Sequence, residues 1–186
     1  MTSPSVLANV TNSVVMKLTA VSVIIVGLIV AGCSTTGRAP QVGRSGFDNA
    51  RTVTIEPHAN TSTRVTATGL GAHWSAAWQD QVILEVAVFN LATGITNAEL
   101  NIDGKKTTLE RNGDVTDIDR TGDVIISTNS FKTNLATVEK ILKSKRTWLR
   151  VGTPTGTLED AVIDGPTDSK AFHALERFMA AVKASD

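Results

Sequence analysis

The chain has 186 residues, of which 41% are hydrophobic, and its 18 basic and 18 acidic side chains leave no net charge at pH 7 with histidine neutral. That length suits one ordinary domain, and the charge balance excludes an overall electrostatic attraction for nucleic acid. A single cysteine cannot form a disulfide framework. The sequence also has no phosphate-binding glycine loop, nucleotide fingerprint or H-E-x-x-H helix, so we predict no cofactor.

The chain is organised around residues 16–33, MKLTAVSVIIVGLIVAGC. Lys17 provides a positive charge, an apolar run follows from residue 18 to residue 30, and the segment ends in Ala31-Gly32-Cys33. A charged start, a short apolar core and small residues at the end are typical of a secretory signal peptide. The ending resembles the lipobox of bacterial lipoproteins, in which an aliphatic residue and two small residues precede an obligatory cysteine.

The resemblance covers residues 16–34 and implies how the protein is held. In bacterial lipoproteins the cysteine sulfur receives a diacylglycerol, signal peptidase II cuts before the cysteine, and the new amino terminus receives a fatty acid such as palmitate. The resemblance therefore implies that Cys33 is the lipid-attachment residue and that residues 1–32 are the signal peptide. Ser34, where an Asp usually signals inner-membrane retention, resembles the outer-membrane sort. We expect a lipid-anchored protein of the cell envelope, facing the periplasm from the outer membrane.

Two alternatives concern this segment. An uncleaved transmembrane anchor needs about 20 apolar residues, but the run here is shorter and is interrupted by polar residues and a glycine. Residues 1–15 carry no charge, although the region before a signal core is normally positive, so translation from Met16 gives a conventional signal. The alternative there is an unusually long leader. Whether translation starts at Met1 or at Met16, cleavage before Cys33 leaves 154 residues with 17 basic and 18 acidic side chains.

After the cysteine, composition divides the chain into a tether and a domain. Residues 33–50 are rich in Ser, Thr, Gly and Pro without apolar periodicity, which predicts a flexible tether. Residues 51–186 predict a single α+β domain, in which two helices pack on a mainly antiparallel sheet. Runs of alternating apolar residues predict strands at residues 51–56, 64–68, 81–90, 98–102, 105–110, 124–128, 147–153 and 158–163.

Three local patterns carry most of the fold prediction. Residues 81–90, QVILEVAVFN, are apolar on both faces, which indicates a central strand. Asp103-Gly104 between two alternating segments predicts a two-residue hairpin turn. Apolar residues at helical spacing predict amphipathic helices at residues 134–145 and 169–184, the first with its N-cap at residue 133 or 134.

One acidic motif resembles the start of a calcium loop. It is Asp117-Ile118-Asp119-Arg120-Thr121-Gly122, with oxygen ligands at alternate positions and a glycine for the turn. However, Thr128 stands where an EF-hand has its bidentate Glu, inside a predicted strand. The motif therefore favours an acidic turn between strands, and we predict no metal site.

Aromatic and histidine residues offer no stronger candidate. Trp74 and Trp78 could stack on a sugar, but a pair spaced by four residues on a short turn favours packing against the sheet. His58, His73 and His173 lack metal-ligand spacing. We expect His173 to be solvated on the outer face of the last helix.

A local excess of positive charge is the remaining candidate, because only Glu139 opposes it within its segment. The simplest interpretation is the solvated face and the dipole-favoured end of a helix. The functional interpretation is a contact surface for an anionic envelope polymer or for lipid headgroups. The residues are Lys132, Lys140, Lys143, Lys145, Arg146 and Arg150.

No catalytic constellation is evident, so we predict a non-enzymatic binding or envelope-maintenance role. The expected partners are the membrane, through the lipid anchor, and an anionic envelope polymer or an envelope protein, but no nucleic acid. One alternative is a cell-envelope hydrolase whose catalytic residues are distant in sequence. Another is a phage-encoded exclusion lipoprotein that blocks an entry channel.

Overall fold

The computed structural model describes residues 37–184. The chain divides into two units, Met1–Cys33 and Ser34–Asp186. The first unit, with the predicted signal peptide and lipid-attachment cysteine, lies outside the described residues, so the fold below is that of the second. Within the described range, no helix is both long and apolar enough to cross a bilayer.

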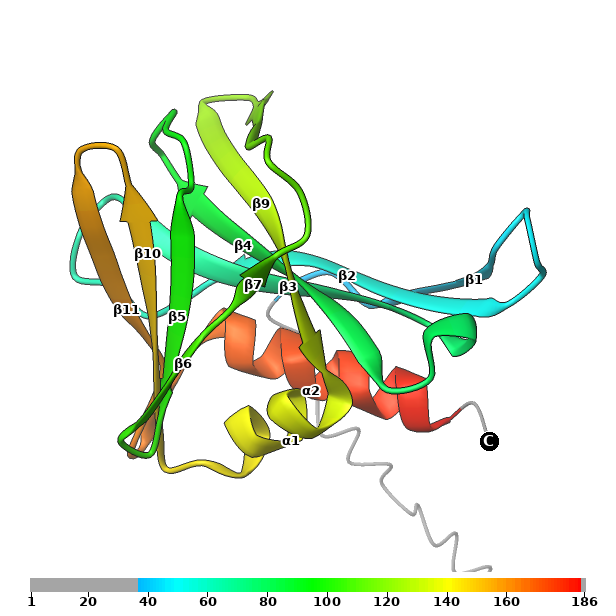
Figure 1. The fold of residues 1–186 in the computed structure, drawn as a ribbon. Helices are drawn as coiled ribbons and strands as arrows, with labels where there is room; N and C mark the ends of the chain where they lie inside the picture. Colours follow the sequence, from blue (N-terminus) through cyan, green and yellow to red (C-terminus); the bar gives the residue numbers. More distant parts are fainter. Residues whose placement is uncertain (1–36, 185–186) are drawn as a thin grey trace, which may run out of the picture. The chain divides into compact units, whose positions relative to one another are not determined.

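Antiparallel strands dominate the described chain and form two sheets (Figure 1). The larger sheet has the order β1-β2-β3-β4-β9-β7, and β8 also pairs with β9. Its strands are β1 (Gln41–Arg44), β2 (Arg51–Ala59), β3 (Ala67–Ser75), β4 (Gln81–Phe89), β7 (Glu110–Arg111), β8 (Asp117–Thr121) and β9 (Val124–Asn134). Since β4 pairs with both β3 and β9, the central position predicted for residues 81–90 is confirmed.

The smaller sheet has the order β12-β11-β10-β5-β6. Its strands are β5 (Asn97–Ile102), β6 (Lys105–Thr108), β10 (Arg146–Thr153), β11 (Gly156–Asp164) and β12 (Thr167–Asp168). Ile102 pairs with Lys105, so Asp103 and Gly104 form the two-residue turn that the sequence predicts. Their φ angles are 47° and 88°, and positive φ at both central residues is the hairpin geometry that Asp-Gly favours.

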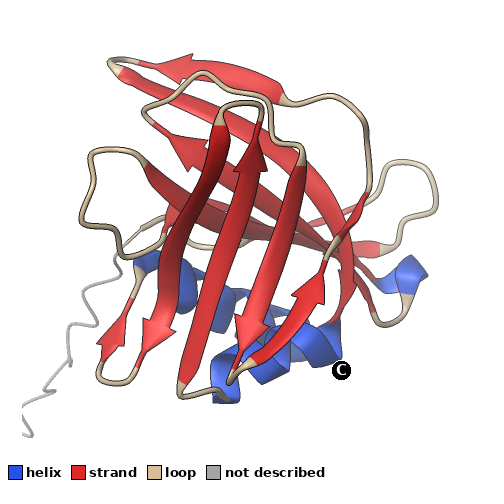
Figure 2. Ribbon diagram, turned by 60° about the vertical axis from the view of Figure 1, so that its left-hand side comes forward, coloured by secondary structure: helices blue, strands red, loops and turns tan. Residues whose placement is uncertain are grey.

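A continuous stretch of chain and a backbone bridge join the sheets directly. Leu109 alone separates β6 from β7, so one stretch of chain passes from the smaller sheet into the larger. An antiparallel bridge joins Thr61, in the loop after β2, to Ala161 of β11. Figure 2 shows the strands curving around a shared interior. One hydrophobic core therefore contains side chains from both sheets and from the helices.

Two amphipathic helices, α1 (Leu135–Lys143) and α2 (Lys170–Lys183), lie together on one side of the strands (Figures 1 and 2). Asn134 caps α1 by accepting a hydrogen bond from the backbone N–H of Thr137 at 2.8 Å, and Ser169 caps α2 in the same way. The apolar stripe predicted for α2 is buried at Phe172, Leu175, Phe178, Met179 and Val182. The fold is therefore α+β, as the sequence predicts.

A buried carboxylate ties the two sheets together. Asp160 on β11 is 2% exposed, and one of its oxygens accepts a hydrogen bond from the backbone N–H of Thr68 on β3 at 2.7 Å. The guanidinium of Arg64 donates to the other oxygen at 2.9 Å. Since Thr68 is itself fully buried, its N–H would lack a partner without this carboxylate.

The prediction of a flexible tether over residues 33–50 is wrong for its C-terminal part. Residues 41–44 form β1 and pair with residues 51–54 of β2. Before this strand, the guanidinium of Arg38 forms an ion pair with Glu56 at 2.6 Å. Every side chain of β1 is exposed, so no apolar alternation marks the strand in the sequence.

The acidic motif is also placed differently from its prediction. Residues 117–121 form a strand paired with β9, and the turn falls at Gly122 and Asp123. Asp117 and Asp119 therefore belong to a ladder rather than to a turn. The strands also divide into two sheets, where the sequence suggests one.

Strand β3 lies further along the chain than its sequence pattern indicates. Residues 64–66 of the predicted strand belong to the preceding loop, and the strand continues through Gly69 and Gly71 to Ser75. A Cβ at Gly69 would lie 2.5 Å from the backbone oxygen of His58, and a Cβ at Gly71 would lie 2.6 Å from that of Ile55. The close approach of β2 therefore requires glycine at both positions. In the sequence the same glycines interrupt the alternation that predicts a strand.

Candidate functional site

The six basic residues predicted as one surface belong to different elements. Lys132 lies on β9, Lys140 and Lys143 on α1, Lys145 in the loop after α1, and Arg146 and Arg150 on β10. Carboxylates pair with most of them, and all of these except Glu139 come from other parts of the sequence. The pairs are Lys132–Glu110 at 3.1 Å, Lys143–Glu139 at 3.6 Å, Arg146–Asp164 at 3.3 Å, and Arg150 with Glu99 at 3.3 Å and Glu159 at 2.7 Å. The predicted surface is therefore split. Arg146 and Arg150 line a first hollow, Lys140 and Lys143 line a second, and Lys132 and Lys145 line neither of the two.

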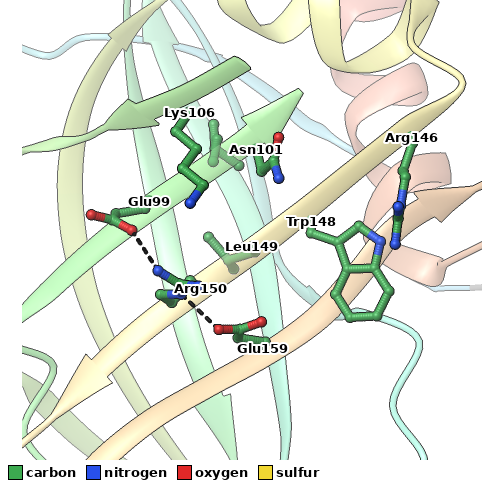
Figure 3. A pocket seen from close by; sticks show the side chains of 9 residues that line it. Glu99, Asn101, Lys106, Arg146, Trp148, Leu149, Arg150 and Glu159 are labelled. Carbon is green, nitrogen blue, oxygen red and sulfur yellow. Dashed lines mark hydrogen bonds and ion pairs between the residues drawn. The ribbon is translucent and has the colours of Figure 1, made fainter. Parts of the chain in front are cut away.

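The first hollow lies on the outer face of the smaller sheet (Figure 3). Arg146, Trp148 and Arg150 alternate along β10 and so share this face, while the residues between them are buried. The neighbouring strands β5, β6 and β11 contribute the other polar side chains. These are Glu99, Asn101, Lys106 and Glu159.

Hydrogen bonds fix the β10 side chains in this hollow. Arg150 lies between Glu99 and Glu159, which are its direct cross-strand partners. The hydrogen bond to Glu159 is the main cause of the raised pKa of Arg150. The indole N–H of Trp148 donates to Asp164 at 3.1 Å, and the guanidinium of Arg146 lies 5.5 Å from the indole centroid. Such a stacked cation adds about 0.5–1 kcal/mol at an exposed site.

The first hollow is polar but balanced in charge. Its described cations, Arg146, Arg150 and Lys106, face an equal number of carboxylates. The side-chain oxygen of Asn101 is buried without a hydrogen-bond partner among the described residues. A ligand with a hydrogen-bond donor would satisfy that oxygen, but the face as a whole does not select an anion.

The second hollow lies between α1 and the β5–β6 hairpin, and positive charge dominates it. Its lining residues are Ile102, Asp103, Lys105, Thr107, Thr137, Lys140, Lys143 and Ser144. We call this site the lysine hollow. Among these described residues, three carry an ammonium group and one carries a carboxylate.

That carboxylate is already engaged by the backbone. One oxygen of Asp103 accepts hydrogen bonds from the backbone N–H groups of Lys145 and Arg146, at 3.1 and 2.9 Å. These bonds hold the loop after α1 against the hairpin turn. Lys145 comes directly after the lining residue Ser144 in the sequence, so it adds a further exposed cation beside the lysine hollow.

Glu139 provides the remaining negative charge near the lysine hollow. Its carboxylate lies 2.7 Å from the ammonium group of Lys183 on α2 and 3.6 Å from that of Lys143. The hydrogen bond from Lys183 is the main cause of its lowered pKa. Because Lys143 is 77% exposed and holds the longer contact, an anionic ligand can draw it away at little cost.

The calcium-loop candidate finds no support in the fold. Asp117 and Asp119 lie in β8, and the Asp119 carboxylate accepts a hydrogen bond from the adjacent backbone N–H of Arg120. Among residues 37–184, no group of three or more His, Cys, Asp or Glu side chains is arranged to hold a metal.

Trp74 packs in the core as predicted, but Trp78 does not. Trp74 is 8% exposed and its indole N–H donates to the backbone oxygen of Gln79 at 2.7 Å. Trp78 is 38% exposed and meets the ring of His73 edge-on, with centroids 5.1 Å apart. The spacing of four residues therefore misleads here, because Trp74 lies on β3 whereas Trp78 ends a short 3-10 turn, Ala76–Trp78.

The last histidine is held more firmly than the solvated side chain that the sequence suggests. Nδ1 of His173 lies 2.8 Å from Glu176, and Nε2 lies 3.1 Å from Asp168. The hydrogen bond to Glu176 is the main cause of its raised pKa. The second carboxylate, Asp168, is the last residue of β12, so residue spacing within α2 does not predict this contact.

A half-buried carboxylate on β4 was not among the residues singled out from the sequence. Glu85 is the single charged residue of β4, and Ser130 on the paired strand β9 donates to its two oxygens at 2.9 and 3.0 Å. Burial raises its pKa. The signal was an acidic residue inside an otherwise apolar strand, which is the pattern of a half-buried, hydrogen-bonded group.

Comparison with known proteins adds no relative: no protein-family model, curated protein or solved structure matches this chain. What the chain does is therefore inferred from the sequence of its first segment and from the chemistry of the two hollows.

Proposed function

We propose that this chain is an exported lipoprotein, anchored through lipid on Cys33 to the periplasmic face of the outer membrane. The order of residues 16–33 supports the proposal: a charged start, a short apolar core, and two small residues before the single cysteine. Acylation of both the sulfur and the new amino terminus provides the two or more chains that stable anchoring requires.

We further propose that the domain is a non-enzymatic module that binds an anionic envelope polymer at the lysine hollow. The observation that carries this proposal is the accumulation of Lys105, Lys140 and Lys143 around one hollow whose carboxylate, Asp103, is bonded to backbone N–H groups. Phosphate or carboxylate groups repeated along a polymer would meet several ammonium groups at once. Exposed pairs are individually weak, so repeated contact provides the affinity.

Charge distribution favours this hollow over the face of β10. There, Arg150 is shared by two glutamates and Arg146 is paired with Asp164. An anion approaching that face would have to displace carboxylates that are already in place. The lysine hollow requires no such displacement except at Lys143.

A charge-reversal pair tests the binding proposal. Lys140→Glu with Lys143→Glu should weaken binding of the full lipidated protein to polyphosphate and to polygalacturonate by roughly tenfold or more, since two contacts of about 1 kcal/mol each are reversed. Binding by the wild type should fall as salt rises, because exposed charges are screened beyond about 8 Å at physiological ionic strength.

The matched control is Lys106→Glu with Lys132→Glu. It changes the net charge equally but lies outside the lysine hollow, since Lys106 lines the other hollow and Lys132 pairs with Glu110 on the larger sheet. The control should retain wild-type binding. Equal loss in both double variants would mean that net charge alone, and not this hollow, determines binding.

A further inference from the structure

The described chain enters the domain very soon after the proposed lipid-attachment residue. Between Cys33 and Gly37, the first described residue, stand only Ser34, Thr35 and Thr36. The sequence alone predicts a tether of 18 residues, from 33 to 50. The structure leaves at most this short connection.

Contacts with β2 and α2 hold the chain in place from Gly37 onward. Gly37 has φ +116°, and a Cβ there would lie 2.0 Å from Nε2 of His58, so the backbone lies directly against that ring. The backbone N–H of Arg38 donates to the same nitrogen at 3.1 Å. On the other side, the guanidinium of Arg177 on α2 donates to the backbone oxygen of Arg38 at 3.4 Å.

Covalent geometry limits the distance between the lipid and the domain. An extended chain covers at most about 3.6 Å per residue, so the four steps from Cys33 to Gly37 span no more than about 14 Å. An α-helix with its side chains is already about 10–12 Å wide. The connection is therefore little longer than the width of one helix, which keeps the part of the domain around Gly37 close to the headgroups.

We infer that the domain docks on the bilayer through the face around Gly37, and that phospholipid headgroups are its partner; this rests on the proposed acylation of Cys33. Arg38, Lys170 and Arg177 are the cations of this face. The Arg38 side chain is 73% exposed, and Lys170 is the exposed first residue of α2. Arginine and lysine side chains bind phosphate oxygens, and arginine does so in bidentate geometry.

The neighbouring carboxylates do not oppose this contact strongly. Glu56 pairs with Arg38 at 2.6 Å, while Asp168 and Glu176 both contact His173. The acidic groups of the face are thus engaged within the domain. The short tether brings the domain into contact with the membrane, and the cations determine which face of the domain meets the headgroups.

Docking at this face has a consequence for the ligand. The helix α1, which lines the lysine hollow, packs beside α2, and Lys183 of α2 pairs with Glu139 of α1 at 2.7 Å. The turn between β10 and β11 lies at the end of the strands away from both helices (Figures 1 and 2). Docking through α2 therefore keeps the lysine hollow, and a polymer bound there, on the side of the domain that is near the membrane.

Site-specific quenching tests the docking. Full-length protein carrying Lys170→Cys or Thr155→Cys is purified after lipidation, labelled with a thiol-reactive fluorophore and reconstituted in vesicles of phosphatidylethanolamine and phosphatidylglycerol. Cys33 is the only native cysteine and is blocked once acylated. A short-range nitroxide quencher on the lipid headgroups should quench residue 170 several-fold more than residue 155, which lies in the β10–β11 turn. Equal quenching, or greater quenching at residue 155, would overturn the inference.

A lengthened connection tests whether the short tether is the cause. Twelve Gly and Ser residues inserted between Thr36 and Gly37 add roughly 20 Å of flexible reach, and quenching at residue 170 should then fall toward the value at residue 155. Unchanged quenching would remove the tether as the cause. Vesicle flotation separates the two proposals: wild-type protein that fails to float and takes up the label contradicts acylation of Cys33, whereas protein that floats with equal quenching contradicts only the docking.

Discussion

The backbone N–H of Arg38 donates a hydrogen bond to Nε2 of His58 across 3.1 Å. Nδ1 of the same ring lies 2.7 Å from the backbone oxygen of Glu56, which can only accept. The ring is therefore neutral, with its proton on Nδ1. A second proton on Nε2 would face the N–H of Arg38 and break the bond that holds the start of the described chain.

This arrangement predicts an acid-sensitive step in stability. Burial lowers the pKa of His58, with Arg177 and Lys170 adding to the effect and Glu56 opposing it. The unfolded state then binds more protons than the folded state, so the free energy of unfolding should fall as pH drops through the unfolded value of about 6.5. His58→Gln should reduce the loss measured by urea unfolding between about pH 7.5 and about pH 5. An unchanged pH slope would contradict the assignment.

His173 should act in the opposite direction. Glu176 and then Asp168 raise its pKa, apart from a smaller opposing effect of burial. Its stabilising contribution is therefore fully present below the unfolded pKa and is lost as pH rises through the folded pKa. His173→Gln should lower the free energy of unfolding more at about pH 5 than at about pH 8, and should steepen the acid loss that His58→Gln relieves. Equal effects at both pH values would show that the two carboxylates do not hold a charged ring.

Substitution of one buried and one exposed phenylalanine tests the packing of α2. Phe178 is 0% exposed in the core, so Phe178→Ala should cost about 3–5 kcal/mol of unfolding free energy. Phe47 is 100% exposed at the β1–β2 turn, so Phe47→Ala should change stability by less than about 0.5 kcal/mol. Denaturant unfolding of both variants measures the difference. A small loss for Phe178→Ala would mean that α2 does not cover the sheet.

The carboxylate that joins the two sheets allows a graded test. Asp160→Ala leaves the buried N–H of Thr68 without its acceptor and should cost about 1–3 kcal/mol. Asp160→Asn retains a side-chain oxygen for that N–H and should recover part of the loss. Thermal unfolding of the wild type and of the two Asp160 variants measures their order of stability directly. Equal stability of the Ala variant and the wild type would contradict a structural role for this bond.

Much of the fold is predictable from local sequence because those signals are complete within one segment. The alternation in residues 81–90, the Asp103-Gly104 turn and the apolar stripe of α2 each depend on side chains close in sequence. The exposed strand β1 lacks such a signal. In β3, Gly69 and Gly71 interrupt the apolar alternation, because the close approach of β2 leaves no room for a side chain there.

The candidate site was harder to predict because its charges are set by strand pairing. Arg150 looks unopposed within its own segment, yet Glu99 and Glu159 stand directly across from it on the neighbouring strands. Conversely, Lys105 joins Lys140 only because the β5–β6 hairpin folds against α1. Sequence counts of local charge cannot include these partners, which lie in other parts of the chain.

The most direct test of the account is the intact mass of the wild-type protein purified from the membrane fraction of its producing cell. We predict a chain that begins at Cys33 and carries a diacylglyceryl group on sulfur with an additional acyl chain on the amino terminus, while Cys33→Ala yields no lipid-bearing species. A mature protein with an unmodified Cys33, or one cleaved at another residue, would contradict the lipid anchor and with it the membrane docking that depends on it.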